Sequence, residues 1–127
     1  MKQIVRLTLI GFFLNLLAVG QPADMPVLFS RGNFITGDNI ARGNFRKDSI
    51  SEALFDHRYY VLLQFQQLPG KKQQADLLQA GIRLETYLPG NAYLAVLEEN
   101  TDFSRLAAYG IRSVNTVPAQ YRADADL

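Results

Sequence analysis

The chain has 127 residues, of which 48% are hydrophobic and 20% are charged, and its formal net charge is +1. These values are typical of one small globular domain with some additional chain. The sequence contains no cysteine, which excludes disulfides, a thiolate nucleophile and a cysteine-ligated metal site.

The first 20 residues have the pattern of a secretory signal peptide. Lys2 and Arg6 form a short positive region, and the apolar run at 7–19 is too short to span a bilayer comfortably. Small residues precede Gln21, so we expect cleavage before it. The alternatives are a buried core helix or an uncleaved anchor. We therefore predict a secreted or periplasmic protein without a stable membrane anchor after cleavage.

Removal of the predicted signal peptide would also change the charge balance. Lys2 and Arg6 are the only charged side chains in residues 1–20, so the net charge would fall from +1 to −1. A protein that binds nucleic acid usually carries an excess of basic residues to contact phosphates. The charge therefore argues against a nucleic-acid partner.

Residues 21–57 are predicted to form an extended arm, because the part up to residue 47 is rich in glycine and proline and has no helical or alternating period. The tetrapeptide Arg-Gly-Asn-Phe occurs at 31–34 and again at 42–45. It indicates either a duplicated aromatic anchor or, as we favour, a chance recurrence. Ser49 and Glu52 fit a capping box and predict a short helix over 49–55.

Residues 58–118 are predicted to form the compact domain. Gly81 and Gly110 each follow a helix-like run and precede Ile-Arg, which is typical of a helix stop followed by a strand. The second helix begins at Thr101 or Asp102, both good caps. The predicted elements are a strand at 59–67, a helix at 71–80, strands at 82–88 and 92–98, a helix ending before Gly110 and a strand at 111–117.

This β-α-β-β-α-β order predicts an α+β, ferredoxin-like fold, with both helices on one face of a four-stranded antiparallel sheet. The two central strands are apolar on both faces, so the face without helices should expose apolar side chains. We expect some of Tyr60, Leu62 and Tyr87 on that open face, together with either Tyr93 or Leu94, and we expect Leu88 to face the helices. Such a patch usually marks a partner site. An unoccupied surface, or cover by residues 25–57, is the alternative.

No catalytic, metal or cofactor site is predicted, and we expect no enzymatic activity from this chain. His57 is the single histidine, and no Gly-x-Ser-x-Gly motif accompanies it, so we interpret it as a solvated loop residue. Glu98 and Glu99 are interpreted as a solvated turn rather than an acid–base pair.

Several stretches resemble the N-terminal prodomain of secreted subtilisin-like serine peptidases of the Bacteroidetes type. The resemblance covers nearly all of residues 25–122. The stretches that carry it are Arg58–Phe65, Leu68-Pro69, Ala80–Leu84, the hairpin Tyr87–Ala95 and Val117–Arg122.

The resemblance implies a propeptide that acts as folding chaperone and temporary inhibitor of a subtilisin-like peptidase, in cis or in trans. It implies that the open face, with Tyr60, Leu62, Tyr87 and Leu94, contacts the peptidase. It also implies that an extended tail at 119–127 fills the substrate cleft. The cleft-binding candidates are Gln120, Tyr121, Arg122, Ala123, Asp124, Ala125, Asp126 and Leu127.

The catalytic blocks of a peptidase do not follow Leu127. The chain is therefore expected to be a fragment or truncated product of such a peptidase, or a separate inhibitor. Two other hypotheses stay open. One is a periplasmic or surface interaction module with a non-protease partner or a self-dimer. The other is a small-molecule sensor.

Overall fold

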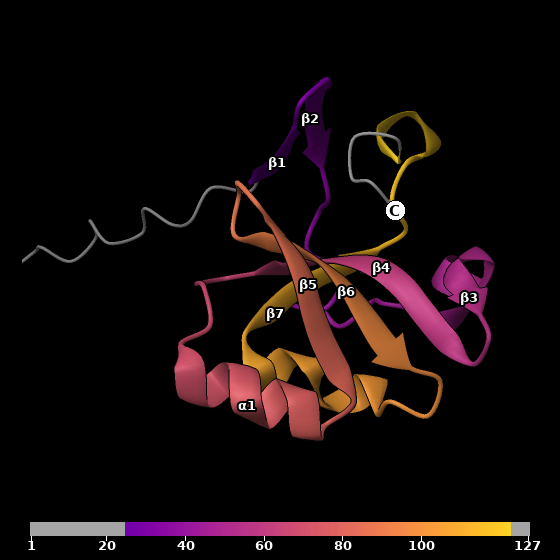
Figure 1. Ribbon diagram of the computed structural model, residues 1–127, viewed down its shortest axis with the longest axis vertical. Helices are drawn as coiled ribbons and strands as arrows, with labels where there is room; N and C mark the ends of the chain where they lie inside the picture. The colour runs from indigo at the N-terminus through magenta and orange to yellow at the C-terminus, as the bar shows by residue number, and fades with distance from the viewer. Residues whose placement is uncertain (1–24, 123–127) are drawn as a thin grey trace, which may run out of the picture.

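The computed structural model describes residues 25–122, which form an α+β domain with antiparallel sheets (Figure 1). The predicted signal peptide at 1–20 lies outside the described residues. The same holds for the part of the predicted tail from Ala123 to Leu127.

The main sheet is built around β4 (Arg58–Phe65), which pairs with β6 (Ala92–Glu98) on one side. On its other side β4 pairs with β7 (Ile111–Asn115) and, near its start, with the short strand β3 (Leu54–Phe55). β5 (Ile82–Leu88) pairs with β6 at the opposite edge. β4 and β6 are thus interior strands, and their apolar sequences suit that position because other layers cover one face and part of the other.

Both predicted glycine stops are confirmed. Helix α1 (Lys71–Gln79) is followed by Gly81 at φ +88°, and the 3₁₀ helix η3 (Phe103–Tyr109) is followed by Gly110 at φ +78°. Both angles lie in the left-handed region that favours glycine. The second predicted helix is thus present as a 3₁₀ helix of seven residues.

One face of the sheet is covered by α1 and η3. Leu77 of α1 and Leu106 of η3 belong to the same buried cluster as the β4 residues that point toward the helices. Figure 1 shows both helical segments on the same side of the sheet. The β4 residues in this cluster are Tyr59, Val61, Leu63 and Phe65.

The prediction of an extended arm was wrong. Residues 26–35 form a β-hairpin of β1 (Pro26–Phe29) and β2 (Gly32–Ile35) instead. The short helix predicted over 49–55 is present as the 3₁₀ helix η2 (Lys47–Ala53). Each hairpin strand is four residues long, so the sequence offers too few residues for an alternating period to stand out.

The capping box predicted at Ser49 was also wrong. η2 is preceded by Arg46, and the Ser49 hydroxyl donates a hydrogen bond to the Arg46 carbonyl at 2.6 Å. The last two residues of the predicted helix, Leu54 and Phe55, form β3 instead.

The register of β5 differs from the expected alternation. The β5–β6 pairing shifts between Leu84 and Thr86, so that Tyr87 lies opposite Tyr93 and Leu88 lies opposite Ala92. A bulge of one residue moves all later side chains to the other face. Tyr87 is therefore on the helix-covered face, and Leu88 is on the opposite face, contrary to both predictions.

Candidate partner-binding face of the sheet

The face of the sheet opposite the helices is divided into a covered part and an exposed part. Arg58, Tyr60, Leu62 and Gln64 alternate along β4 onto this face. Leu62 is 0% exposed, whereas Tyr60 is 40% exposed. We call the two parts the covered half and the uncovered half of the open face.

The covered half lies beneath the β1–β2 hairpin and the segment after β7. Val27 and Phe29 of β1 belong to one buried cluster with Leu62 of β4 and Leu94 of β6. Val117 and Tyr121 complete this cluster from the C-terminal side. Figure 1 shows the hairpin on the opposite side of the molecule from α1. The hairpin therefore forms a third layer on part of the sheet.

Gln64 fixes the hairpin to the sheet. Its side chain is fully buried, and its amide nitrogen donates to the carbonyls of Met25 at 2.7 Å and Gly90 at 2.8 Å. Its amide oxygen accepts a hydrogen bond from the Thr36 hydroxyl. A buried amide is tolerated only when its donors and acceptors are satisfied, so Gln64 defines where both ends of the hairpin must lie.

The hairpin also approaches the turn between β5 and β6 very closely. The Leu28 N–H donates to the Pro89 carbonyl at 2.9 Å. A Cβ atom at Gly90 would lie 2.2 Å from the Pro26 carbonyl oxygen, and Gly90 has φ +106°. Only glycine fits this position, for conformational and steric reasons together.

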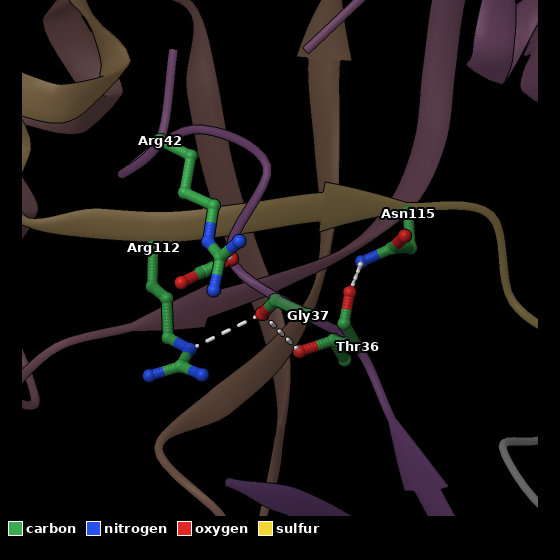
Figure 2. Close-up of polar contacts among 6 residues, drawn as sticks. Thr36, Gly37, Arg42, Arg112 and Asn115 are labelled. Atoms are coloured by element: carbon green, nitrogen blue, oxygen red, sulfur yellow. Dashed lines mark hydrogen bonds and ion pairs between the residues drawn. The ribbon is translucent and has the colours of Figure 1, made fainter. Parts of the chain in front are cut away.

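The chain that follows the hairpin covers the outer edge of β7. The Asn39 side-chain amide donates to the Val114 carbonyl at 2.8 Å and accepts from the Val114 N–H at 3.0 Å. Figure 2 shows Arg112 and Asn115 reaching from β7 to the carbonyls of Gly37 and Thr36, at 3.1 and 3.3 Å. A sheet edge covered in this way cannot pair with another strand.

The uncovered half presents two aromatic side chains. Phe55 is 72% exposed and Tyr60 is 40% exposed. Phe55 lies opposite Arg58 in the β3–β4 pair, and Tyr60 follows Arg58 on the same face. A two-residue turn with positive φ at Asp56 (52°) and His57 (63°) joins the strands, as in type I′ hairpins.

Two charged pairs include an arginine that shares the open face with these two aromatic residues. Arg58 lies 3.5 Å from Glu98, and Arg83 lies 2.9 Å from Glu85, measured between the paired nitrogen and oxygen atoms. Arg83 lies opposite Val96, which in turn lies opposite Tyr60, so Arg83 shares the open face. An exposed aromatic centre with a charge-balanced rim is typical of protein–protein interfaces.

The four face residues predicted from the sequence do not form one exposed patch. Tyr60 lies on the uncovered half. Leu62 and Leu94 lie beneath the hairpin, with Leu94 3% exposed. Tyr87 is exposed on the other face, edge-to-face with Tyr93 at 5.6 Å. Sequence reasoning missed Phe55, because it was assigned to a helix.

The described start of the tail is not extended. Gln120 and Tyr121 belong to the 3₁₀ turn η4 (Ala119–Tyr121), and Tyr121 is buried. Arg122 Nε donates to the Val117 carbonyl at 3.0 Å, which closes the turn. The extended conformation predicted for the tail was therefore wrong for residues 120–122.

His57 Nδ1 lies 2.7 Å from Oε1 of Glu99, and both side chains reach solvent. Among residues 25–122, no group of three His, Asp or Glu side chains could hold a metal ion. No helix within that range is long and apolar enough to cross a membrane.

The domain is an α+β unit in which a sheet carries helices on one face and a β-hairpin on part of the other. The chain belongs to the family described as Domain of unknown function (DUF8729), whose sequence profile matches residues 28–118. The match begins within β1 and ends at Pro118, so it includes β2 and the segment that covers β7 but not the start of β1. No curated protein and no solved structure matches the chain.

Proposed function

We propose that this chain is a secreted protein-binding module of the prodomain type, which binds a subtilisin-like serine peptidase as a folding chaperone and temporary inhibitor. The observation that carries the proposal is the pair Phe55 and Tyr60, exposed together on the uncovered half of the open face. The peptidase activity belongs to the partner domain, in cis or in trans.

The strand order supports the proposal. β5-β6-β4-β7, with α1 and η3 as the two crossover elements, is the order of a ferredoxin-like βαββαβ unit. We assign the domain to that arrangement, with a 3₁₀ helix as its second helix and the β1–β2 hairpin as an addition. In this assignment the uncovered half of the sheet is the flat surface that lies against the partner.

The chemistry of the uncovered half suits a protein partner. A Phe or Tyr side chain buries roughly 150–250 Å² in a contact, so two neighbouring aromatic residues can supply the centre of an interface. Arg58 and Arg83 each already have a carboxylate nearby, so they suit a polar rim more than a buried charge contact. We expect the binding energy to concentrate on Phe55 and Tyr60.

The proposal is tested by titrating the chain, starting at Gln21, into several subtilisin-like peptidases, including one from the same genome. We expect inhibition at micromolar concentration. Phe55→Ala and Tyr60→Ala should each raise the inhibition constant about tenfold or more, as expected for central interface residues. Leu78→Ala, which truncates an exposed residue of α1, is the matched control and should have no effect.

Two outcomes would count against the proposal. One is the absence of inhibition with every peptidase tested. The other is a stable dimer, detected by light scattering, whose formation depends on Tyr60, because the uncovered half would then be used for self-association.

A further inference from the structure

We infer that Tyr121 and the β1–β2 hairpin form a seat that sets where the C-terminal chain leaves the domain, on the same side of the sheet as Phe55 and Tyr60. This inference rests on the proposed function and adds a positioning role to it. Tyr121 would act through the segment it holds, not by contacting the partner itself.

Tyr121 contacts the β1–β2 hairpin through both its ring and its hydroxyl. Its ring stacks on Phe29 with centroids 4.5 Å apart and an interplanar angle of 5°. Its hydroxyl donates to the Asn33 carbonyl at 3.1 Å. A Cβ atom at Gly32 would lie 3.2 Å from that hydroxyl, so the hairpin strand leaves room for the ring. One residue therefore contacts both strands of the hairpin.

The seat and the uncovered half lie on the same side of the sheet. Tyr121 belongs to the buried cluster that contains Leu62, and Leu62 shares a face of β4 with Tyr60. β7 lies at the sheet edge, so the chain after Asn115 could continue toward either face. Val117 and Tyr121 direct it over the open face, and the Arg122–Val117 hydrogen bond closes the turn there.

This placement matters if one partner contacts both the face and the chain beyond Arg122. When two contacts belong to one rigid unit, the second forms at an effective concentration of about millimolar or more, without new interactions. Fixing the exit point also reduces the entropy lost when the second contact forms. Tyr121 is thus expected to strengthen inhibition more than it strengthens docking of the face.

The test compares two readouts on the full chain from Gln21. The first is inhibition of the active peptidase. The second is affinity for the same peptidase with its catalytic serine covalently blocked, so that the substrate cleft is occupied. Tyr121→Ala should weaken inhibition by a factor on the order of ten and leave the second affinity within about twofold, because only the coupled contact is lost.

Two further variants serve as controls. Tyr121→Phe keeps the ring stack and should inhibit nearly as the unchanged chain does. Phe55→Ala should weaken both readouts equally. If Tyr121→Ala does not fold, Phe29→Leu replaces it, because this change removes the stack and keeps an apolar side chain.

Trypsin cleavage after Arg122 tests the seat independently of any peptidase partner. The structure predicts cleavage at least about fivefold faster in Tyr121→Ala, because a site must open locally before it is cut. Equal cleavage rates, or unchanged inhibition by Tyr121→Ala, would overturn the inference. The unchanged chain could inhibit none of the peptidases while trypsin still cuts Tyr121→Ala faster than the unchanged chain. In that case the proposed function is wrong, and the positioning role is wrong with it.

Discussion

The two faces of the main sheet are covered in different ways. On the helix-covered face, Leu77 and Leu106 pack onto a continuous apolar surface. On the open face, two four-residue strands bury Val27 and Phe29 in a smaller apolar cluster and are fixed in place by individual polar and backbone contacts, most of all those of Gln64. The comparison shows that a strand that is apolar on both sides need not expose the whole of either side, because a short hairpin can cover part of the face that helices leave open.

The difference also predicts how each face responds to substitution. An apolar interface loses stability in proportion to the atoms removed. The hairpin interface depends, in addition to its apolar cluster, on a few positions at which only one residue type fits. Single changes at these positions should therefore have large effects, and the predictions below go from the largest to the smallest.

Gly90→Ala should have the largest effect. The new Cβ would lie 2.2 Å from the Pro26 carbonyl oxygen, so the Pro26 carbonyl would have to move away. The φ of +106° at this position is also strained for alanine. Together with loss of hairpin packing, we expect a decrease in unfolding free energy of about 3 kcal/mol or more, measured by denaturant titration.

Gly43→Ala is the matched control for that experiment. Gly43 also has a positive φ, +74°, but a Cβ there would meet nothing within 4 Å. The Gly43→Ala substitution should lower the unfolding free energy only through the strained backbone conformation, by about 1–2 kcal/mol. Equal losses for the two variants would show that the hairpin contact contributes nothing.

Gln64→Met should have the next largest effect. The substitution keeps the volume and leaves the Met25 and Gly90 carbonyls without the amide that donates to them, whereas the Thr36 hydroxyl keeps the Gly37 carbonyl as a partner at 3.1 Å. Unpaired buried groups cost about 1–3 kcal/mol each when water cannot reach them, so we expect a total loss of about 2–4 kcal/mol.

Gln66, an exposed glutamine just after the end of β4, provides the matched control. Gln66→Met should change the unfolding free energy by less than about 0.5 kcal/mol. Hydrogen exchange should localise the Gln64→Met effect to the β1–β2 hairpin. Exchange that rises uniformly across α1 and η3 as well would contradict a local role.

Ser113→Ala should be slightly stabilising. Ser113 lies opposite Gln64 in the β4–β7 pair and is fully buried, and within residues 25–122 its hydroxyl has no hydrogen-bond partner. Removal of an unsatisfied hydroxyl should raise the unfolding free energy by up to about 1 kcal/mol. A clear loss in a thermal melt would show that the hydroxyl has a partner.

Asp102→Ala should have the smallest effect and should depend on pH. The hydroxyl and the backbone N–H of Ser104 hold the pKa of the Asp102 carboxyl below its usual value. The stabilisation is present above the usual pKa of an aspartate and is lost as the pH falls through the lowered pKa. Melting temperatures of the two proteins should thus differ near neutral pH and converge in strong acid.

The helix-covered face could be predicted because its signals are local and repeated. β5 and β6 have the predicted bounds, and the glycines after both helical segments have the predicted conformation. Strand alternation and a left-handed glycine require no knowledge of distant residues.

Cover of the open face by residues 25–57 was predicted only as an alternative, and its details could not be predicted, because its determinants connect distant residues. From the sequence alone, Gln64 is interpreted as a polar side chain at an exposed strand position. Its buried role becomes visible only when the fold brings the carbonyls of Met25 and Gly90 to it. The bulge near Glu85 inverted the position of Tyr87 without altering the apolar pattern visibly. Phe55 was missed because a two-residue strand has no period to detect.

The hydrogen bonds between Asn39 and Val114 connect residues that are 75 positions apart, and Asn39 comes first. A chain is synthesised from its amino end, so the group that covers the last strand is already present when that strand emerges. The strand with the latest opportunity to pair can then find its edge partner within the same molecule. Newly made chains should consequently be protected from joining one another into extended sheets while they fold.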